Sequence, residues 1–450
     1  MGWLRRITHS YHTHTNDMNF YFADIYFWKS RGTRIVSFAF SLALAFAFVV
    51  PTSSRAASTS ITPNIVFILG DDVGIGDIGC TGGPFASPRI NAMAQGGTQF
   101  QYCYAAPLCG PSRCQFLTGR YPFRTGLINN HVWNAIQPSH EVMIPTVLKQ
   151  AGYVTASIGK WGQMALGPLR WGFDEALVFN GNGHYWRAQG ANYSINGVTQ
   201  DLPLGTYLPD VMHSFLVDFI TRHKDQPFFV YYPMSHIHAP IVATPDSKPG
   251  ANANQLYADN VAYMDKLVGK LLDELDRLNL RQNTLVIFSG DNGTAMPGIQ
   301  AGSSVNGRRV YKAKAHLTEG GCRVPCIVNW PGTTPAGQVK TDLLDYSDFF
   351  VTFAALAGAP LPAGVKLDGH SFLPQIQGQP GQPRDWVFDQ LDTNYYVRDA
   401  RWKLTNDRQM FDLINAPWVE APVAVNTKDP AAIAARKQLQ ADINSLHIGY

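Results

Sequence analysis

The sequence carries little charge, and neither sign is in clear excess. Lys, Arg, Asp and Glu make up 15% of the 450 residues, and the formal net charge at pH 7 is +3. Residues 1–56 hold six of the basic residues and two of the acidic ones, so the rest of the chain is close to −1. Because such a chain has no global basic field, it is not predicted to bind nucleic acid.

The sequence also lacks internal repeats, low-complexity tracts and an apolar run as long as the ~20 residues of a membrane-spanning helix. The run Ile35–Val50, "IVSFAFSLALAFAFVV", has 16 residues, follows two arginines and precedes small residues, which is typical of an export signal cleaved after Ala56. An uncleaved anchor is the alternative, and Met18 is a second possible start. We expect residues 1–56 to be a leader, and the protein to be exported (periplasmic or secreted) without stable membrane insertion after cleavage.

Cysteine is sparse, and its spacing does not suggest a simple disulfide framework. Cys322 and Cys326 flank an extended "RVP". Four extended residues span roughly 13 Å, which is beyond disulfide reach, so these two are not expected to pair. The pairing of the others stays open. The six cysteines are Cys80, Cys103, Cys109, Cys114, Cys322 and Cys326.

Short continuous apolar runs alternate with helical patterns along the middle of the chain. Runs of this kind are typical of strands buried on both faces, and their alternation with helices predicts an α/β fold with a large, mostly parallel central sheet sandwiched by helices. The expected strands are 65–69, 157–161, 227–234, 284–289 and 326–330, and the expected helices are 88–96 and 257–278.

The pattern changes beyond residue 375, where "GQPGQPRD" resembles a linker. Three short segments joined by turns predict a small C-terminal antiparallel sheet. A closing helix over 430–446 is predicted from Asp429 as its N-cap and Pro430 in its first turn. We therefore expect an N-terminal domain over 57–375, which carries the candidate site, and a C-terminal subdomain over 376–450.

Two acidic pairs follow two of the expected strands. Asp71 and Asp72 come directly after the first, and Asp291 and Asn292 come directly after another. Functional groups of open parallel sheets gather at the carboxyl ends of strands, and an oxygen-rich set favours Ca²⁺ or Mg²⁺ over zinc. Each pair alone is equally well explained as a polar turn.

Other candidates are weaker when taken singly. His236 and His238 follow the strand "PFFVYYPM", and one of them is predicted to be an acid or base, with a structural histidine as the alternative. Lys160 also follows a strand-like segment, but Lys160 and Lys314 by themselves are most simply surface residues.

The stretch "LCGPSRCQFLTGR" contains a predicted helix start. Pro111 suits a first helical turn, which puts Cys109 just before the helix, where the positive helix end and Arg113 favour an anion. Cys109 is then a reactive nucleophile, the precursor of another group, or an ordinary buried cysteine. Cys114 is expected to be a core residue one turn into the helix.

The residues "CGPSRCQFLTGR" resemble the signature of the formylglycine-dependent (type I, arylsulfatase A-like) sulfatases of the alkaline phosphatase superfamily. Further segments are similar in the same order: "PNIVFILGDDVGIGDIGC", "GKW" with "WGFDE", "VIFSGDNG", "EGGCRVPCIVNWPG" and "VRDARWKLTNDRQMFDL". The resemblance covers roughly residues 62–415.

This resemblance implies that a formylglycine-generating maturation enzyme oxidises Cys109 to formylglycine (3-oxoalanine). One hydroxyl of its hydrate then attacks sulfur, and the second hydroxyl expels sulfate. It also implies that Ca²⁺ is held by residue 109 together with Asp71, Asp72, Asp291 and Asn292.

By the same resemblance, the cationic residues act on the reacting groups. Arg113 holds the diol, Lys160 and Lys314 neutralise sulfate oxygens, and His238 is the general acid for the leaving oxygen.

One position departs from the family pattern. Many relatives read Gly-Lys-Trp-His, whereas this chain has Gly162 in place of the histidine that helps to deprotonate the second hydroxyl. The residues considered as a replacement base are His131, His184 and His316.

Substrate recognition is assigned to Gln163 and His184. The segment Asn180–Tyr207 is loop-rich, and its aromatic and amide groups suit a sugar ring, although a polar surface insert explains them equally well.

The predicted function is that of an exported, calcium-dependent sulfatase acting on a sulfate monoester, either a sulfated carbohydrate or an aryl sulfate. One alternative is a phosphate or phosphonate ester hydrolase of the same superfamily. The other is a catalytically impaired homologue that binds sulfated glycans.

Overall fold

The computed structural model describes residues 62–132, 134–162, 164–179, 185–187, 193–295 and 303–449. The expected leader, residues 1–56, lies outside them. Within the described ranges, the helices are all too short or too polar to cross a bilayer.

A large mixed sheet forms the centre of the fold, with eleven strands among the described residues. The middle strand, β1 (Asn64–Gly70), lies parallel to β7 (Phe228–Pro233) on one side and to β8 (Thr284–Gly290) on the other. All seven residues of β1 are buried, because helices cover both faces of the sheet. The predicted α/β class is thus confirmed.

The sheet extends from this centre in both directions. Beyond β7 lie the parallel strands β3 (Val154–Lys160) and β4 (Glu175–Phe179), and beyond β8 lies the antiparallel β12 (Cys326–Asn329). The outer strands are β2 (Thr98–Tyr104), β5 (Tyr193–Ile195), β6 (Val198–Gln200), β11 (Arg323–Val324) and β13 (Gln338–Asp345). The short strands β5 and β6 fall in the segment that was expected to be loop-rich.

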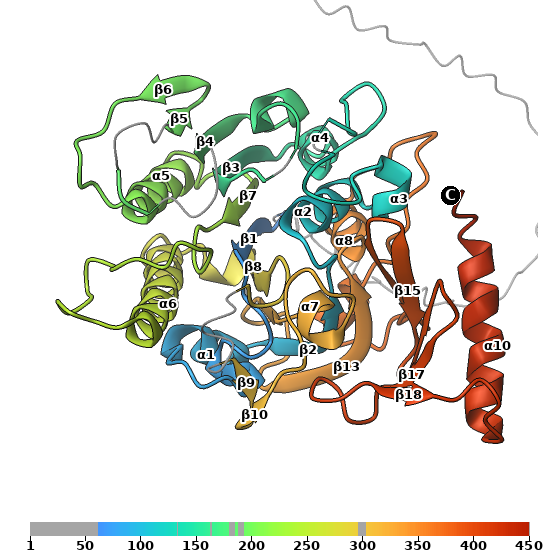
Figure 1. Ribbon diagram of the computed structural model, residues 1–450. Coiled ribbons are helices and arrows are strands. Elements are labelled where there is room, and N and C mark those ends of the chain that lie inside the picture. Colours follow the sequence, from blue (N-terminus) through green and yellow to red (C-terminus); the bar gives the residue numbers. More distant parts are fainter. Residues whose placement is uncertain are drawn as a thin grey trace, which may run out of the picture. The chain divides into compact units, whose positions relative to one another are not determined.

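Side chains alternate between two hydrophobic layers across β1. Phe67 belongs to a core cluster with Phe116 and Phe349, whereas Ile68 belongs to a second cluster with Leu267. Figure 1 shows α1, α5 and α6 on one side of the sheet and α2, α4 and α8 on the other. These helices span Pro88–Gln95 (α1), Cys109–Thr118 (α2), Ile144–Gln150 (α4), Leu208–Arg222 (α5), Ala253–Arg277 (α6) and Asp348–Ala357 (α8).

Shorter elements connect these layers. They are the helices α3 (Pro122–Thr125), α7 (Glu319–Cys322) and α9 (Leu373–Ile376), three 3₁₀ turns (Gly79–Thr81, Pro168–Trp171 and Arg281–Asn283), and the hairpin strands β9 (Ser304–Val305) and β10 (Arg308–Arg309). In the hairpin, Asn306 and Gly307 both have positive φ, as a two-residue turn between twisted strands requires.

A separate antiparallel sheet follows the linker-like segment, as predicted. Its strands are β14 (Val387–Leu391), β15 (Asn394–Arg398), β16 (Trp402–Thr405), β17 (Met410–Asp412) and β18 (Ala421–Val423). The closing helix α10 (Pro430–Ser445) packs on it, and the Asp429 side chain accepts a hydrogen bond from the Ala431 N–H at its start. The domain boundary near residue 375 stays a prediction.

All six cysteines lie in described residues and are free thiols. Cys322 and Cys326 therefore do not pair with each other, as expected from their spacing. Cys114 lies in the core at 1% exposure, also as expected.

Candidate active site

The two acidic pairs meet because their strands are neighbours in register. Gly70 at the end of β1 is paired with Gly290 at the end of β8. The residues that follow, Asp71 with Asp72 and Asp291 with Asn292, therefore leave the sheet side by side. The Asp72 N–H donates to Asp291 Oδ1 at 2.9 Å, which fixes one loop on the other.

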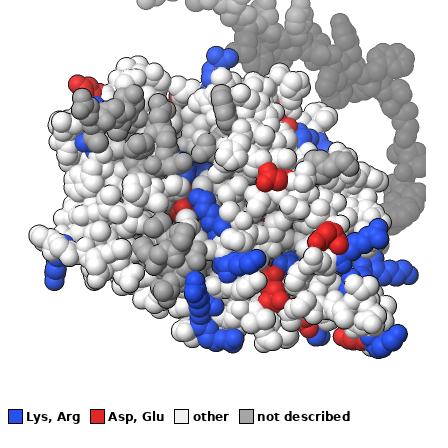
Figure 2. Space-filling view, in the orientation of Figure 1, with Lys and Arg blue, Asp and Glu red and all other residues white. Residues whose placement is uncertain are grey.

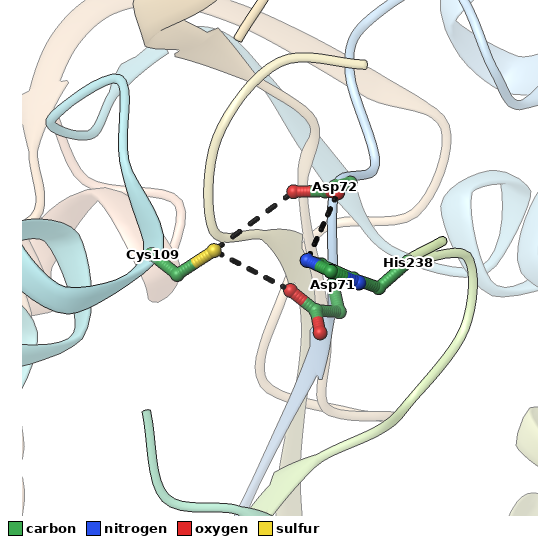
Figure 3. A group of neighbouring side chains, drawn as sticks. All are labelled: Asp71, Asp72, Cys109 and His238. Atoms are coloured by element: carbon green, nitrogen blue, oxygen red, sulfur yellow. Dashed lines mark hydrogen bonds and ion pairs between the residues drawn. The ribbon is translucent and has the colours of Figure 1, made fainter. Parts of the chain in front are cut away.

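Cys109 faces these carboxylates from the first turn of α2. Its Sγ lies 3.7 Å from Asp71 Oδ1 and 3.9 Å from Asp72 Oδ1, and the residue is 1% exposed (Figure 3). The helix begins at Cys109 itself, one position earlier than expected. The Gly110 N–H donates to Asn130 Oδ1 at 2.9 Å, which anchors this end of the helix.

Two lysines from different segments converge on the same sulfur. Lys160, the last residue of β3, has its Nζ 3.5 Å from Cys109 Sγ and 2.7 Å from Asp71 Oδ2. Lys314 has its Nζ 3.2 Å from the sulfur and in contact with Asp72 Oδ1.

Arg113 lies one turn into α2 and is fully buried. Its Nη2 is 2.7 Å from Asp291 Oδ2 and 3.2 Å from Asp71 Oδ1, and its Nη1 donates to the Lys160 carbonyl at 2.8 Å. Arg113 thus ties together the loops that carry both acidic pairs.

Three carboxylates and three cations balance in this buried cluster. Burial would raise the pKa of Asp71, but Lys160 and Arg113 outweigh it and lower that pKa below its usual value. Burial would lower the pKa of Lys160, but Asp71 and the sulfur of Cys109 raise it. Burial, followed by the Asp291 carboxylate, raises the pKa of the Cys109 thiol to about 12, which offsets the positive field expected from the helix end.

The two histidines have different surroundings. His238 is 15% exposed, and its Nε2 lies 3.7 Å from Asp72 Oδ2 while its Nδ1 lies 2.6 Å from the Ala239 carbonyl. A proton on Nδ1 leaves Nε2 facing the cluster. His236 is completely buried, its Nε2 is 2.9 Å from Tyr207 Oη, and burial lowers its pKa to about 3. His236 therefore has the surroundings of a structural residue.

The cluster also has the composition of a cation site. Asp71, Asp72, Cys109 and His238 each offer one potential ligand atom, and these atoms all lie within 4.8 Å of one another. Asp72 Oδ2 and Asn292 Oδ1 are buried without a hydrogen-bond partner. Buried oxygens of this kind are normally satisfied, and a divalent cation that prefers oxygen ligands would satisfy them.

Gly162 lies against Arg113 and has φ +92°, a conformation that favours glycine. Of the residues considered as a replacement base, His131 and His316 are exposed, and His316 Nδ1 lies 3.0 Å from the Lys314 carbonyl. Gln163 and His184 lie outside the described residues.

Sequence reasoning missed a supporting carboxylate, Asp77. Its Oδ2 accepts from the Gly74 N–H at 2.7 Å and from Thr294 Oγ1 at 2.6 Å, and its Oδ1 accepts from Tyr257 Oη at 3.0 Å. Asp77 therefore joins the loops after β1 and β8 to helix α6. The turn "GDDVGIGD" contains it, but the sequence does not identify its distant partners.

Comparison with known proteins identifies the family of this chain. Residues 63–359 match the family model described as Sulfatase. The chain is 36% identical over 387 residues to N-acetylgalactosamine-6-sulfatase of Canis lupus familiaris, a match that covers 77% of this chain and 72% of that protein. It is 29% identical over 451 residues to Arylsulfatase D of Homo sapiens, covering 80% and 76% of the two chains.

A solved structure extends the agreement to the fold. The crystal structure of Ps i-CgsB in complex with k-i-k-neocarrahexaose matches with a TM-score of 0.74 and 26% identity, covering 86% of this chain and 92% of that one. Fold, site and relatives together define a sulfuric ester hydrolase. The chain belongs to the sulfatase family.

Proposed function

We propose that this sulfatase hydrolyses a sulfate monoester of a carbohydrate, with residue 109 converted to formylglycine and Ca²⁺ bound beside it. The observation that carries the proposal is the position of Cys109 Sγ, between the carboxylates of Asp71 and Asp72 and within 3.5 Å of Lys160 and Lys314 Nζ.

The surroundings of this sulfur suit a hydrated aldehyde. The two hydroxyl groups of the hydrated aldehyde would lie where the sulfur lies now. Lys160 and Lys314 could donate hydrogen bonds to them, and the carboxylates of Asp71 and Asp72 could accept hydrogen bonds from them. When formed and hydrated, formylglycine supplies a hydroxyl nucleophile and a second hydroxyl on the same carbon. Its formation removes sulfide and two electrons from the Cys109 side chain and adds one oxygen, so it needs a maturation enzyme with an external oxidant.

The oxygen ligands are consistent with calcium. Asp71, Asp72, Asp291 and Asn292 would hold it together with residue 109. When bound, Ca²⁺ would polarise the sulfate and lower the pKa of the nucleophilic hydroxyl. The unpartnered Asp72 Oδ2 and Asn292 Oδ1 support this assignment.

The cationic side chains act directly on the reacting groups in this proposal. Lys160 and Lys314 bind the non-bridging sulfate oxygens, because their Nζ atoms already lie around the nucleophile position. Charge that spreads onto those oxygens in the transition state is stabilised by fixed cations. Arg113 orients the hydrated side chain of residue 109 and holds Asp291 in place.

In the form that carries a proton on both ring nitrogens, His238 donates its Nε2 proton to the leaving oxygen. It is partly exposed, and its Nε2 borders the cluster. The Tyr185 hydroxyl donates to the His238 carbonyl at 2.9 Å, which fixes this turn. General acid catalysis of this kind typically contributes about 10²–10⁴-fold in rate.

The name of one relative and the ligand of one solved neighbour favour a carbohydrate substrate. One is an N-acetylgalactosamine-6-sulfatase, and one solved neighbour was crystallised with neocarrahexaose. The assignment of Gln163 and His184 to substrate binding, export through the leader, and the domain division at residue 375 are parts of the same proposal.

The test is to express the chain with and without a formylglycine-generating enzyme. The expected result is a loss of about 18 Da from the peptide containing Cys109, together with hydrolysis of 4-nitrophenyl sulfate by the modified protein only. Cys109→Ala should abolish turnover, whereas Cys114→Ser, a matched change one turn away, should retain it. Faster turnover of 4-nitrophenyl phosphate would favour the phosphate-ester alternative. A modified protein that binds sulfated sugars without turnover would favour the binding alternative.

A further inference from the structure

A groove lies between the closing helix α10 and the small antiparallel sheet. Its volume is about 940 Å³, and small-molecule sites in proteins typically have volumes of about 300–1,000 Å³. Leu404, Met410 and Phe411 line it from β16 and β17, whereas none of the residues of the cluster around Cys109 belongs to its lining. Figure 2 shows several Lys and Arg side chains at the lower right of this face, where Figure 1 places α10 with β17 and β18.

The groove changes in character along α10. Ile433 is followed at helical spacing by Arg436 and Lys437, and then by Gln440 and Asn444, and all five residues line the groove. Residues three and four positions apart lie on the same face of a helix. The apolar end of the groove is therefore one helical turn from the two cations, and the amide groups lie further along the helix.

Apolar side chains at the first end of the groove are exposed to water. Val425 is 85% exposed and Ile433 is 51% exposed, and Val423 and Ala424 precede Val425 in the lining. Removal of apolar surface from water is favourable. An apolar ligand that covers these side chains would therefore gain free energy from surface that the folded chain leaves exposed.

The cations of the groove have no acidic partner. Arg436 donates from Nη1 to the Arg408 carbonyl at 3.1 Å and from Nη2 to the Val423 carbonyl at 3.4 Å. Because a guanidinium has five N–H donors, these two bonds leave donors for an anionic ligand. In the part of the chain that the structure describes, no ion pair joins Arg408, Arg436 or Lys437 to a carboxylate.

The groove as a whole is positively charged. Its lining contains Arg408, Arg436 and Lys437 together with one carboxylate, that of Asp407. This carboxylate accepts hydrogen bonds from Thr405 Oγ1 and, at 2.8 Å, from a neighbouring glutamine side chain. A ligand with one anionic head group and one apolar chain complements both the charge and the exposed apolar end.

We infer that the groove binds a fatty acid anion, a single apolar chain that ends in a carboxylate. The carboxylate binds Arg436 and Lys437, and the chain lies along Val425 and Ile433. A protein partner would bring backbone polar groups to the apolar end, where they would lose water, whereas an alkyl chain brings none. The site is separate from the cluster around Cys109, and the inference does not depend on the proposed function.

The test is calorimetric titration of the full chain with decanoate, decyltrimethylammonium and acetate, at concentrations below micelle formation. We expect the Kd of decanoate to be at least tenfold lower than that of either other ligand, because decanoate alone carries both the negative charge and the apolar chain. Arg436→Gln should raise the Kd of decanoate about tenfold, and Val425→Ser should raise it about fivefold.

Two matched variants control for these changes. Arg170→Gln and Val198→Ser replace an exposed arginine and an exposed valine outside the groove, and both should leave the Kd of decanoate unchanged. Because its side chain is 85% exposed, Val425→Ser should fold even if Arg436→Gln does not. Equal binding of decanoate and decyltrimethylammonium, or a Kd that neither groove variant changes, would overturn the inference.

Light scattering and sedimentation with phosphatidylglycerol vesicles examine two other occupants of the groove. A dimer that Val425→Ser dissociates would assign the groove to a second copy of the chain. Vesicle binding without decanoate binding would assign it to a membrane surface. Either result would also overturn the inference, whereas a monomer that binds decanoate through Arg436 and Val425 supports it.

Discussion

The Arg113 side chain passes so close to Gly162 that a β-carbon at position 162 would lie 2.9 Å from Arg113 Cδ. Gly162, which stands where the resemblance predicts a histidine, is therefore part of how this chain places its arginine. A side chain at 162 would have to adopt a positive φ and also displace a residue that holds Asp291.

We predict that Gly162→Ala lowers kcat/KM for 4-nitrophenyl sulfate about 10- to 100-fold, because a small displacement of Arg113 disturbs the groups that position the nucleophile. Gly152→Ala is the matched control, since Gly152 has φ +84° but no atom near the place of a β-carbon. The Gly152→Ala variant should be less stable than the wild type but should keep its kcat/KM. Equal activity of the two variants would show that Arg113 tolerates the displacement.

Calcium should stabilise the folded protein as well as support catalysis. A ligand that binds only the folded state adds about 2.7 kcal/mol at a concentration one hundred times its Kd. Chelation should therefore lower both Tm and activity, and added Ca²⁺ should restore them. Asn292→Ala removes one predicted ligand and should raise the Ca²⁺ concentration needed for half-maximal stabilisation. Asn444→Ala, a substitution at an exposed residue of α10, should leave that Ca²⁺ concentration unchanged. A Tm independent of Ca²⁺ would contradict the assignment.

The effect of His238→Gln on kcat/KM should depend on the leaving group of the substrate, and this dependence tests whether His238 is the general acid. An activated leaving group such as 4-nitrophenolate needs little protonation, whereas a sugar alkoxide needs a proton as the bond breaks. We expect kcat/KM to fall about 10²-fold or more for a sugar sulfate and much less for 4-nitrophenyl sulfate. The exposed His140→Gln is the control. An equal loss on both substrates would assign His238 to positioning instead.

Asp77 should make stability depend on pH. Burial raises its pKa from 3.8 to about 6, against the hydrogen bonds from Thr294 and Gly74. The folded state then binds this proton more tightly than the unfolded state, so the contribution is present at low pH and is lost as pH rises from about 4 to about 6. The loss amounts to about 3 kcal/mol at most.

Urea unfolding at fixed Ca²⁺, at pH 4 and pH 7, measures this difference. The stability of the wild type relative to Asp77→Asn should fall between these two pH values, because asparagine does not titrate. The exposed Asp225→Asn serves as the control and should show no such change. A constant difference for Asp77→Asn would mean that the carboxyl group ionises normally.

Much of the site could be predicted because strand ends are readable in the sequence. The apolar run before Asp71 and the one before Asp291 mark buried strands, and a parallel sheet brings such ends to one edge. The register of Gly70 with Gly290 then joins residues 220 positions apart. Cys109 was predicted from its signature, since a single buried cysteine has no chemical pattern of its own.

The features that could not be predicted depend on tertiary contacts, which leave no local pattern in the sequence. The first five residues of strand β13 are exposed or half-buried, and all but Val339 are polar, so no apolar run marks it. Strand β18 has three residues, one of them Pro422. Asp77 acquires its role through Thr294 and Tyr257, which lie 217 and 180 positions away in the sequence. The pairing of Arg113 with Asp291 likewise depends on how α2 crosses the end of β8.

The burial of Cys109 limits when, relative to folding, this residue can be modified. At 1% exposure, beneath two lysines and two carboxylates, its side chain offers no approach to another enzyme's active site. Under the proposed function, its chemical conversion has to precede closure of the loops after β1 and β8. Under the same proposal, a molecule that folds with its thiol intact would lack the hydroxyl nucleophile, so the yield of active protein would depend on the rate of modification relative to the rate of folding.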